Sequence, residues 1–314
     1  MREEETRADA GPAGSAGSFR HVLSSPSFYR FGVAAARWVP RRALYRVADV
    51  VGLATYASGP APARHLRANL RRIFPDSSER QIRALARRIF RNFARCLVDY
   101  GSFGSIPAES FDRAIGVFEG RENLEGLFDA GRGVILVTGH IGNWELGGLF
   151  WGQSGVKLNV VTLPEGDARI DRFREAYRHR YRIDTIVVDG TPFATLEMMA
   201  ALRRGEMVAM LVDRWGKADG VAAPFFGGVH YLPRGPFALS RATGAPILPA
   251  FVVREGAAYR GIVERPFVAE GEDDAPCAAR VSEALERVVR RYPDQWYNFV
   301  PIGDNEPPYG RSSP

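Results

Sequence analysis

The stretch GVILVTGHIGNWELGG, residues 133–148, decides the fold. It opens with an apolar run at 133–138 and continues through Gly139, His140 and Gly142 toward a helix that starts near Asn143. An apolar run bounded by glycine is typical of a strand buried on both faces of an α/β sheet. Open α/β sheets bind ligands at the carboxyl ends of their strands, where the N–H groups of the following helix also point. The stretch therefore places His140 at a candidate site.

The chain beyond about residue 113 repeats this alternation of strands and helices. Further strands are expected at 158–163, 184–189, 206–212 and 246–253. Helices are expected at 120–129, 143–152, 169–181, 193–203, 234–243 and 277–292, the last stopped by Pro293. The pattern predicts a single α/β domain with a central, mostly parallel or mixed sheet flanked by helices and preceded by N-terminal amphipathic helices.

Composition divides the chain into four expected regions. Residues 1–18 are acidic and then rich in Ala, Gly and Ser, which predicts a disordered tail rather than a signal peptide. Residues 19–110 are expected to form a helical, basic, membrane-facing platform, 111–302 the α/β core, and 303–314 a C-terminal tail. No run of 18 apolar residues occurs, so no transmembrane helix is predicted.

Two segments of the platform favour an anionic surface as a partner. Residues 27–57 mix aromatic residues with arginines, and Pro40 splits them into two short helices. This suits the headgroup region of a bilayer, with an ordinary amphipathic helix pair as the alternative. Residues 64–95 hold ten arginines against Asp76 and Glu79, while the whole chain has a net charge of only +6. The local excess predicts docking on lipid headgroups or on an acidic protein.

Several classes of protein lack their sequence signals here. The two cysteines, Cys96 and Cys277, exclude a disulfide-dense scaffold and a cysteine-rich zinc module. No two of the five histidines have metal-ligand spacing, so no metal is expected. The nucleophile elbow, the P-loop, the dinucleotide-binding glycines and the zinc-protease motif are absent from the sequence. The basic segment lacks interleaved aromatic residues, so no nucleic acid is expected as a partner.

His140 and Glu145 could act as a pair. Five residues apart, they would lie on different faces of one continuous helix. A turn at 139–142 would instead let His140 fold back over the first helical turn, within reach of the Glu145 carboxylate. Glu145 would then orient the imidazole, and His140 would take a proton from a hydroxyl nucleophile. Periodicity alone leaves open the alternative of a histidine that caps a helix beside an incidental glutamate.

The motif GHIGNWE at 139–145 resembles the H-x4-E/D motif of the lysophospholipid acyltransferase superfamily. The chain is most similar to the bacterial lipid A lauroyl/myristoyl acyltransferase family, which includes phosphatidylinositol mannoside acyltransferases. The resemblance extends over about residues 25–300. It is carried further by RHLRANLRRIFPDSSERQIRALARRIFRNFAR (64–95), LRRGEMVAMLVDRWGKADGVAAPFFG (202–227), PRGPFALSRATGAPILPAFVVR (233–254) and RRYPDQWYNF (290–299).

The resemblance implies a glycerolipid acyltransferase-like fold and a membrane-associated O-acyltransferase. Such an enzyme moves a fatty acyl chain from acyl carrier protein or acyl-CoA to a hydroxyl of a lipid or glycolipid, without a metal or other cofactor. The location implied is the cytoplasmic face of the bacterial inner (plasma) membrane, peripheral or monotopic. His140 and Glu145 match the catalytic pair, Asp213 matches an acidic residue near it, and Arg178 matches a site arginine, with Arg180 as the competing alignment.

Substrate binding is expected at Gly142, Asn143, Trp144, Phe225, Phe226 and Arg234. Arg178 and the N–H groups near Gly142 and Asn143 would stabilise a tetrahedral oxyanion. Phe225 and Phe226 would wall the acyl groove, or else be core aromatics of a turn. Trp296 and Tyr297 are expected as core or interface aromatics.

Two other functions stay open at this point. A related thioesterase or lysophospholipid hydrolase would use water in place of the acceptor. A non-enzymatic basic module would bind a membrane without chemistry. One departure bears on the acceptor: after Gln295 and Trp296 the chain reads YNFVPIGD, where lipid A members usually continue with a Trp–His–Arg–Arg type sequence.

Overall fold

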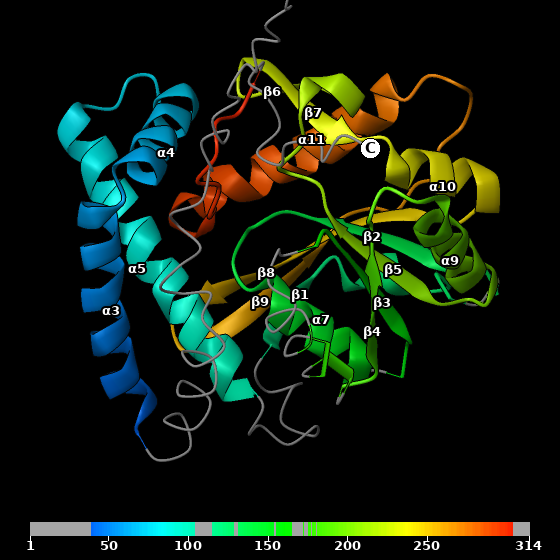
Figure 1. The fold of residues 1–314 in the computed structure, drawn as a ribbon, viewed down its shortest axis with the longest axis horizontal. Coiled ribbons are helices and arrows are strands. Elements are labelled where there is room, and N and C mark those ends of the chain that lie inside the picture. The colour runs from blue at the N-terminus through cyan, green and yellow to red at the C-terminus, as the bar shows by residue number, and fades with distance from the viewer. Residues whose placement is uncertain are drawn as a thin grey trace, which may run out of the picture.

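The computed structural model describes residues 39–103, 115–128, 131–153, 155–164, 172, 175, 176, 178, 179 and 181–303. These residues form one α/β domain whose central sheet lies between helices, beside a group of three N-terminal helices (Figure 1). The predicted fold class is confirmed. The tail expected at 1–18, the tail expected at 303–314 apart from Gly303, the first helix of the 27–57 segment and most of the helix expected at 169–181 lie outside the described residues.

The central sheet has seven strands in the order β1-β9-β8-β2-β5-β3-β4. Their bounds are β1 Ile115–Glu119, β2 Val134–Thr138, β3 Leu158–Thr162, β4 Ile183–Val187, β5 Met207–Leu211, β8 Ile247–Glu255 and β9 Ala258–Val263. The five strands from β8 to β4 are parallel, β9 is antiparallel to β8, and β1 is parallel to β9. The sheet is therefore mixed, with a parallel centre. A two-stranded hairpin, β6 (Gly220–Phe225) and β7 (Gly228–Pro233), stands apart from it.

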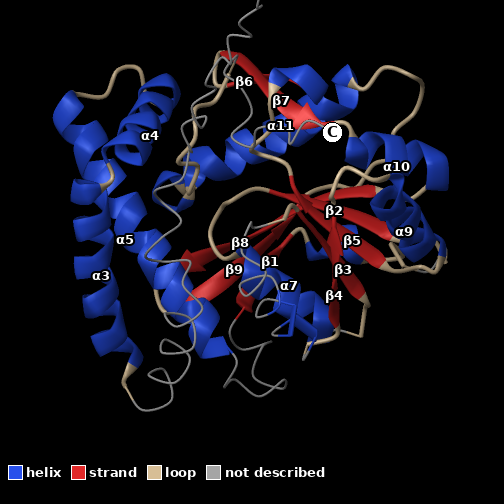
Figure 2. Ribbon diagram, in the orientation of Figure 1, coloured by secondary structure: helices blue, strands red, loops and turns tan. Residues whose placement is uncertain are grey.

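Helices cover both faces of the sheet, as Figure 2 shows. On one side lie α9 (Pro192–Arg203), α10 (Gly235–Thr243) and α11 (Ala275–Arg291), and on the other lies α7 (Trp144–Gln153). The side chains of β2 alternate between the two cores: Ile135 and Val137 face the first, Val134 and Leu136 the second. A strand buried on both faces must be apolar throughout, which explains its sequence.

The helix expected at 120–129 shrinks to a 3-10 turn, η2 (Arg121–Leu124). The helical path ends at Glu125, whose backbone is extended, and Gly126 follows with φ +69° in the left-handed region. β1, β9 and the β6–β7 hairpin have no counterpart among the expected strands. Their short segments carry polar residues and glycine, so the sequence alone predicts loops there, and only pairing with neighbouring strands makes them strands.

The N-terminal platform consists of α3 (Arg41–Ser58), α4 (Pro60–Ile73) and α5 (Glu79–Phe103), which lie side by side in Figure 1. Pro40 directly precedes α3, as the sequence predicts. Before α5, Ser78 and Gln81 form a capping box, in which each side chain accepts a hydrogen bond from the other's backbone N–H. Among the described residues, no helix has both the length and the apolar character needed to span a bilayer.

The platform is tied to the carboxyl end of β2 by its longest helix. On α5, the Cys96 thiol donates to the Gly142 carbonyl at 3.4 Å, and the Asn92 amide donates to the Asp294 carbonyl at 2.9 Å. The residues at these two acceptors belong to the loop after β2 and to the segment after α11. The platform therefore supports the two chain segments that build the candidate site.

Candidate active site

The loop after β2 is shaped by two glycines. A Cβ on Gly139 would lie 3.2 Å from the Asp213 carboxyl carbon. Gly142 has φ +61°, and a Cβ there would lie 2.0 Å from the Val252 carbonyl oxygen. Asn143 then begins α7, because its Oδ1 accepts the Leu146 N–H at 3.0 Å in the manner of an N-cap. His140 is therefore held at the carboxyl edge of the sheet, on the turn that the sequence predicts.

We expect Gly142→Ala to destabilise the fold by about 3 kcal/mol or more, because it combines left-handed strain with a clash against Val252 backbone. Gly155→Ala is the matched control: its φ is +89°, and nothing lies within 4 Å of the added Cβ. Strain alone should cost about 1 kcal/mol there. Urea unfolding would measure both, and equal losses would contradict the close approach described for Gly142.

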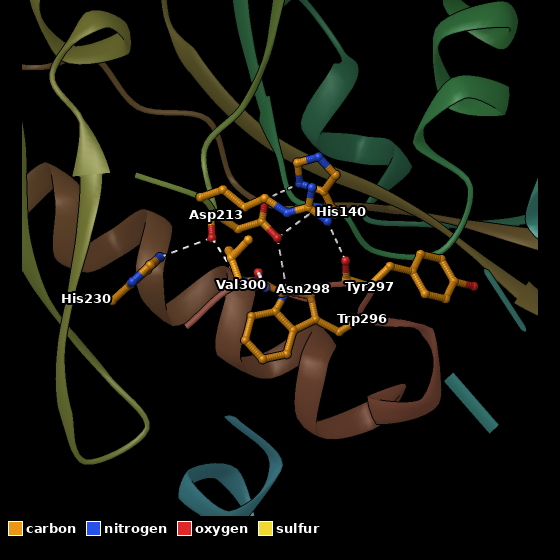
Figure 3. Close-up of polar contacts among 8 residues, drawn as sticks. His140, Asp213, His230, Trp296, Tyr297, Asn298 and Val300 are labelled. Atoms are coloured by element: carbon orange, nitrogen blue, oxygen red, sulfur yellow. Dashed lines mark hydrogen bonds and ion pairs between the residues drawn. The ribbon is translucent and has the colours of Figure 1, made fainter. Parts of the chain in front are cut away.

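Asp213 is the carboxylate that holds His140. It follows β5, the strand that pairs with β2, so both side chains emerge at one edge of the sheet (Figure 3). His140 Nδ1 lies 2.7 Å from Asp213 Oδ1, and the His140 backbone N–H donates to Asp213 Oδ2 at 3.0 Å. The side chain of Asp213 is fully buried, and that of His140 is 18% exposed. The imidazole is thus fixed on one side and open on the other.

Charge favours a neutral imidazole beside an ionised carboxylate. Burial lowers the pKa of His140 below its ordinary value, and the Arg214 charge lowers it further, against the opposing effect of Asp213. Burial raises the pKa of Asp213, but His140, Arg214 and the Trp296 indole outweigh it, so this pKa lies well below its usual range. A carboxylate only accepts hydrogen bonds, so Nδ1 carries the proton. The lone pair on Nε2 is then available as a base.

The segment after α11 locks this pair in place. Trp296 Nε1 donates to Asp213 Oδ2 at 3.0 Å, and the Asn298 amide donates to the Asp213 carbonyl at 3.1 Å. His230 on β7 reaches the same carbonyl through Nε2 at 3.2 Å. The Tyr297 N–H donates to the His140 carbonyl at 2.8 Å (Figure 3). Both carboxylate oxygens and the carbonyl oxygen of Asp213 therefore have hydrogen-bond partners, which leaves the carboxylate one orientation.

Glu145 has a different partner from the one expected. The sequence predicts that Glu145 orients His140, but Asp213 occupies Nδ1 in the structure. Glu145 Oε1 instead accepts a hydrogen bond from Arg178 Nη2 at 2.9 Å. Arg178 is buried, and Arg180 lies outside the described residues. The structure brings these predicted residues together, yet as two pairs: His140 with Asp213, and Glu145 with Arg178.

An apolar cavity of about 60 Å³ lies between α7 and the sheet, next to the Glu145–Arg178 pair. Glu145, Arg178 and Thr138 provide polar atoms, and most other lining residues are apolar, among them Phe118, Leu136, Phe150, Trp151, Leu158 and Val252. Trp144 lines the cavity and also contacts His140 edge-on, with 5.1 Å between ring centroids. Trp144 therefore connects the base to the cavity.

Other expected substrate contacts have different roles. The N–H groups of Gly142 and Asn143 donate to the carbonyls of Gln295 and Val252, at 2.8 and 2.7 Å, so they are not free to bind an oxyanion. The reason is that the loop pairs with two neighbouring segments before α7 begins.

Phe225 and Phe226 do not line the cavity. They are buried beside Trp296, with ring centroids 5.9 and 6.5 Å away, because the β6–β7 hairpin packs against α11. Arg234 precedes α10 and pairs with Asp274 at 3.2 Å. The two phenylalanines are therefore core aromatics, as the alternative expected, and a role as walls of an acyl groove stays a prediction.

Sequence reasoning missed the polar role of five residues. Trp296 and Tyr297 are buried, as expected, but the indole and the backbone also bond the site. His230, Asn298 and Arg214 were not among the expected residues, and only the position of Arg214 directly after Asp213 offered a signal. Within the described ranges, no group of three or more His, Cys, Asp or Glu side chains is placed to hold a metal ion.

Comparison of the sequence with known proteins shows to which family the chain belongs. The chain is 26% identical to a phosphatidylinositol mannoside acyltransferase of Mycobacterium tuberculosis over 62% of this chain, and the match spans only 61% of that relative. It is 26% identical to the Mycolicibacterium smegmatis protein of the same name, over 79% of this chain and 82% of the relative. It is also 26% identical to the lipid A biosynthesis palmitoleoyltransferase of Escherichia coli, over 76% of this chain and 79% of that relative. The sequence model of the family described as "Bacterial lipid A biosynthesis acyltransferase" matches residues 17–301, and the chain belongs to that family.

Proposed function

We propose that this protein transfers a fatty acyl chain from a thioester donor to a hydroxyl of a lipid or glycolipid. The observation that carries the proposal is the His140 imidazole, which Asp213 holds through Nδ1 and which contacts Trp144 in the wall of an apolar cavity. A base in contact with the wall of a cavity lined by apolar side chains suits a reaction between a polar hydroxyl and a long alkyl thioester. The named activities of the relatives support the same reaction class.

The chemistry follows from the two pairs. His140 Nε2 would take the proton of the acceptor hydroxyl while Asp213 stabilises the imidazolium that forms. The freed oxygen would attack the thioester carbon, and the thiolate would leave with the proton from His140. The Glu145–Arg178 pair would close the polar end of the cavity, so that the alkyl chain lies along its apolar walls. In this proposal Glu145 positions the donor and does not orient the base.

A membrane surface fits the platform. On the outer face of α3, Val47 and Val50 are 62% and 69% exposed, next to the exposed Arg46. Apolar side chains flanked by arginines suit the headgroup region of a bilayer. We propose peripheral association with the cytoplasmic face of the plasma membrane. Acyl carrier protein and acyl-CoA both remain candidate donors, and no metal or other cofactor enters the proposed reaction.

The test is a transfer assay with mass spectrometric identification of the product. Purified protein is incubated with myristoyl or palmitoyl thioesters of acyl carrier protein and of CoA, together with a total bacterial membrane lipid extract. We expect a lipid heavier by one acyl group and one free thiol per transfer. Free fatty acid at the same rate with and without lipid would support the hydrolase instead. If no thioester is consumed, the proposal is wrong and the binding module becomes the better hypothesis.

Activity should fall at acidic pH. His140 is the base, and its pKa lies below the ordinary value of 6.5, so the neutral form prevails above that pH and is lost only below it. We therefore expect kcat/KM to be flat from pH 7 to 8 and to decline with a midpoint below pH 6.5. Rates measured from pH 4.5 to 8 at constant ionic strength would show this limb. A midpoint above pH 7 would mean that another group controls the rate.

A further inference from the structure

The site has a base, yet its expected oxyanion donors are occupied. The N–H groups of Gly142 and Asn143 donate to carbonyls, and Arg178 faces the Glu145 carboxylate. Attack on a thioester places a full negative charge on the carbonyl oxygen, and a donor fixed in advance is the usual means of stabilising it. Another cation beside His140 is therefore a candidate for stabilising the oxyanion.

Arg214 lies beside the His140 loop. It directly follows Asp213, and its Nη2 donates to the Tyr297 carbonyl. The N–H of the same Tyr297 donates to the His140 carbonyl at 2.8 Å, and Ile141 forms a β-bridge with Trp296. Arg214 is thus connected to the histidine both through Asp213 and through the segment after α11.

The guanidinium of Arg214 uses little of its hydrogen-bonding capacity. Its only hydrogen bond to the part of the chain that the structure describes goes to the Tyr297 carbonyl, and its Nε is buried without an acceptor. Of the five N–H donors of a guanidinium, those on the two terminal nitrogens that do not bond Tyr297 are available. The side chain is half-buried, which leaves it accessible to a substrate while limiting the screening of its charge by water.

Arg214 also differs from Arg178 in charge balance. Arg178 is neutralised by Glu145 at 2.9 Å, whereas Arg214 forms no ion pair with any described residue. Next to burial, the Arg214 charge is the main cause that lowers the pKa of His140. In the resting site this cation disfavours the imidazolium. An oxyanion between the two would offset that repulsion, so the gain appears when the intermediate forms.

We infer that Arg214 is a catalytic residue that binds the oxyanion of the tetrahedral intermediate, an inference that rests on the acyl transfer proposed above. His140 removes the acceptor proton, and the acceptor oxygen bonds to the thioester carbon. The π pair of the carbonyl moves to its oxygen, which Arg214 N–H groups hold. When the pair returns, the C–S bond breaks and the thiolate takes the proton from His140. The products are an ester and a thiol.

The test compares Arg214→Gln and Arg214→Lys with the wild type. Arg287→Gln is the matched control, because the Arg287 side chain is 57% exposed on α11 and, among the described residues, bonds only Glu264. Thiol release from the palmitoyl thioesters of CoA and of acyl carrier protein is followed with the total membrane lipid extract as acceptor. We expect Arg214→Gln to lower kcat by about 10²–10³-fold, with KM for the thioester within about threefold. Arg214→Lys should lose about tenfold, and Arg287→Gln should not change.

A second readout separates this role from a structural one. Removal of the Arg214 charge raises the pKa of His140, so the acid limb of kcat/KM should move to higher pH in Arg214→Gln but stay in place in Arg214→Lys. Thermal melting checks the fold, and if the Gln variant does not fold, an unchanged kcat in the Lys variant overturns the inference. A folded Gln variant with wild-type kcat, or with a change in KM alone, also overturns it. If the wild type transfers no acyl group, the proposed function is refuted together with this inference. If the wild type is active, the proposed function stands whatever the Arg214 variants show.

Discussion

His140→Ala is expected to lower kcat by about 10²–10⁴-fold, the range that a positioned general base contributes. The variant removes the only base described at the carboxyl edge of β2, while Asp213 keeps its bonds from the Trp296 indole and the residue-140 backbone N–H. Thioester consumption and lipid product are both measured. His65→Ala is the matched control, because His65 is half-buried on α4, away from this edge.

The His140 result requires that the variant folds. The imidazole is 18% exposed, so its removal opens a small gap at the surface and not a sealed cavity. We expect the melting temperature to change by only a few degrees. A folded variant that retains transfer within tenfold of the wild type would show that His140 is not the base.

Asp213→Asn is expected to lower kcat by about 10³–10⁴-fold, because it reverses the tautomer of His140. Two N–H groups, from the His140 backbone and from Trp296, both point at Oδ2. The oxygen of an asparagine amide must lie there, so its NH2 faces Nδ1. Nδ1 then accepts, Nε2 carries the proton, and the base toward the substrate is lost.

The Asp213 experiment also decides between the two carboxylates. Asp184→Asn on the edge strand β4 is the matched control, because Asp184 is 43% exposed and pairs with Lys157. Glu145→Gln is measured in parallel, and we expect a smaller loss of kcat with a rise in KM for the thioester, since Glu145 lines the cavity. Full activity in Asp213→Asn with complete loss in Glu145→Gln would restore the pairing that the sequence predicts.

Local sequence predicted the parallel centre of the sheet because its strands are apolar on both faces. The run at 133–138 became β2, and the alternation around it became α7, α9, α10 and α11. β9 escaped prediction because Tyr259, Arg260 and Gly261 break its apolar pattern, and only pairing with β8 makes it a strand. The expected helix at 120–129 ends at Glu125, whose backbone is extended ahead of the positive φ of Gly126.

In the candidate site too, some features could be predicted from local sequence and others could not. The turn that presents His140, the N-cap at Asn143 and the position of Asp213 after a strand are visible within a few residues. The partner of the imidazole is not, because nearness in sequence suggested Glu145, five residues away, while the sheet brings up Asp213 from 73 residues away. The family resemblance placed both carboxylates near the site, while the argument from the turn assigned the imidazole to Glu145 and not to Asp213.

The sequence by itself therefore determined which strand carries the base, which glycines shape its turn and to which family the chain belongs. Tertiary structure decided which carboxylate orients His140, what Trp296 and Arg214 contact, and where the apolar cavity lies. The physical reason is the distance along the sequence between the residues that interact. Turn conformations and helix caps depend on side chains a few residues apart. The meeting of β2, β5 and the segment after α11 depends on the register of parallel strands and on burial between layers, which no single stretch of sequence encodes.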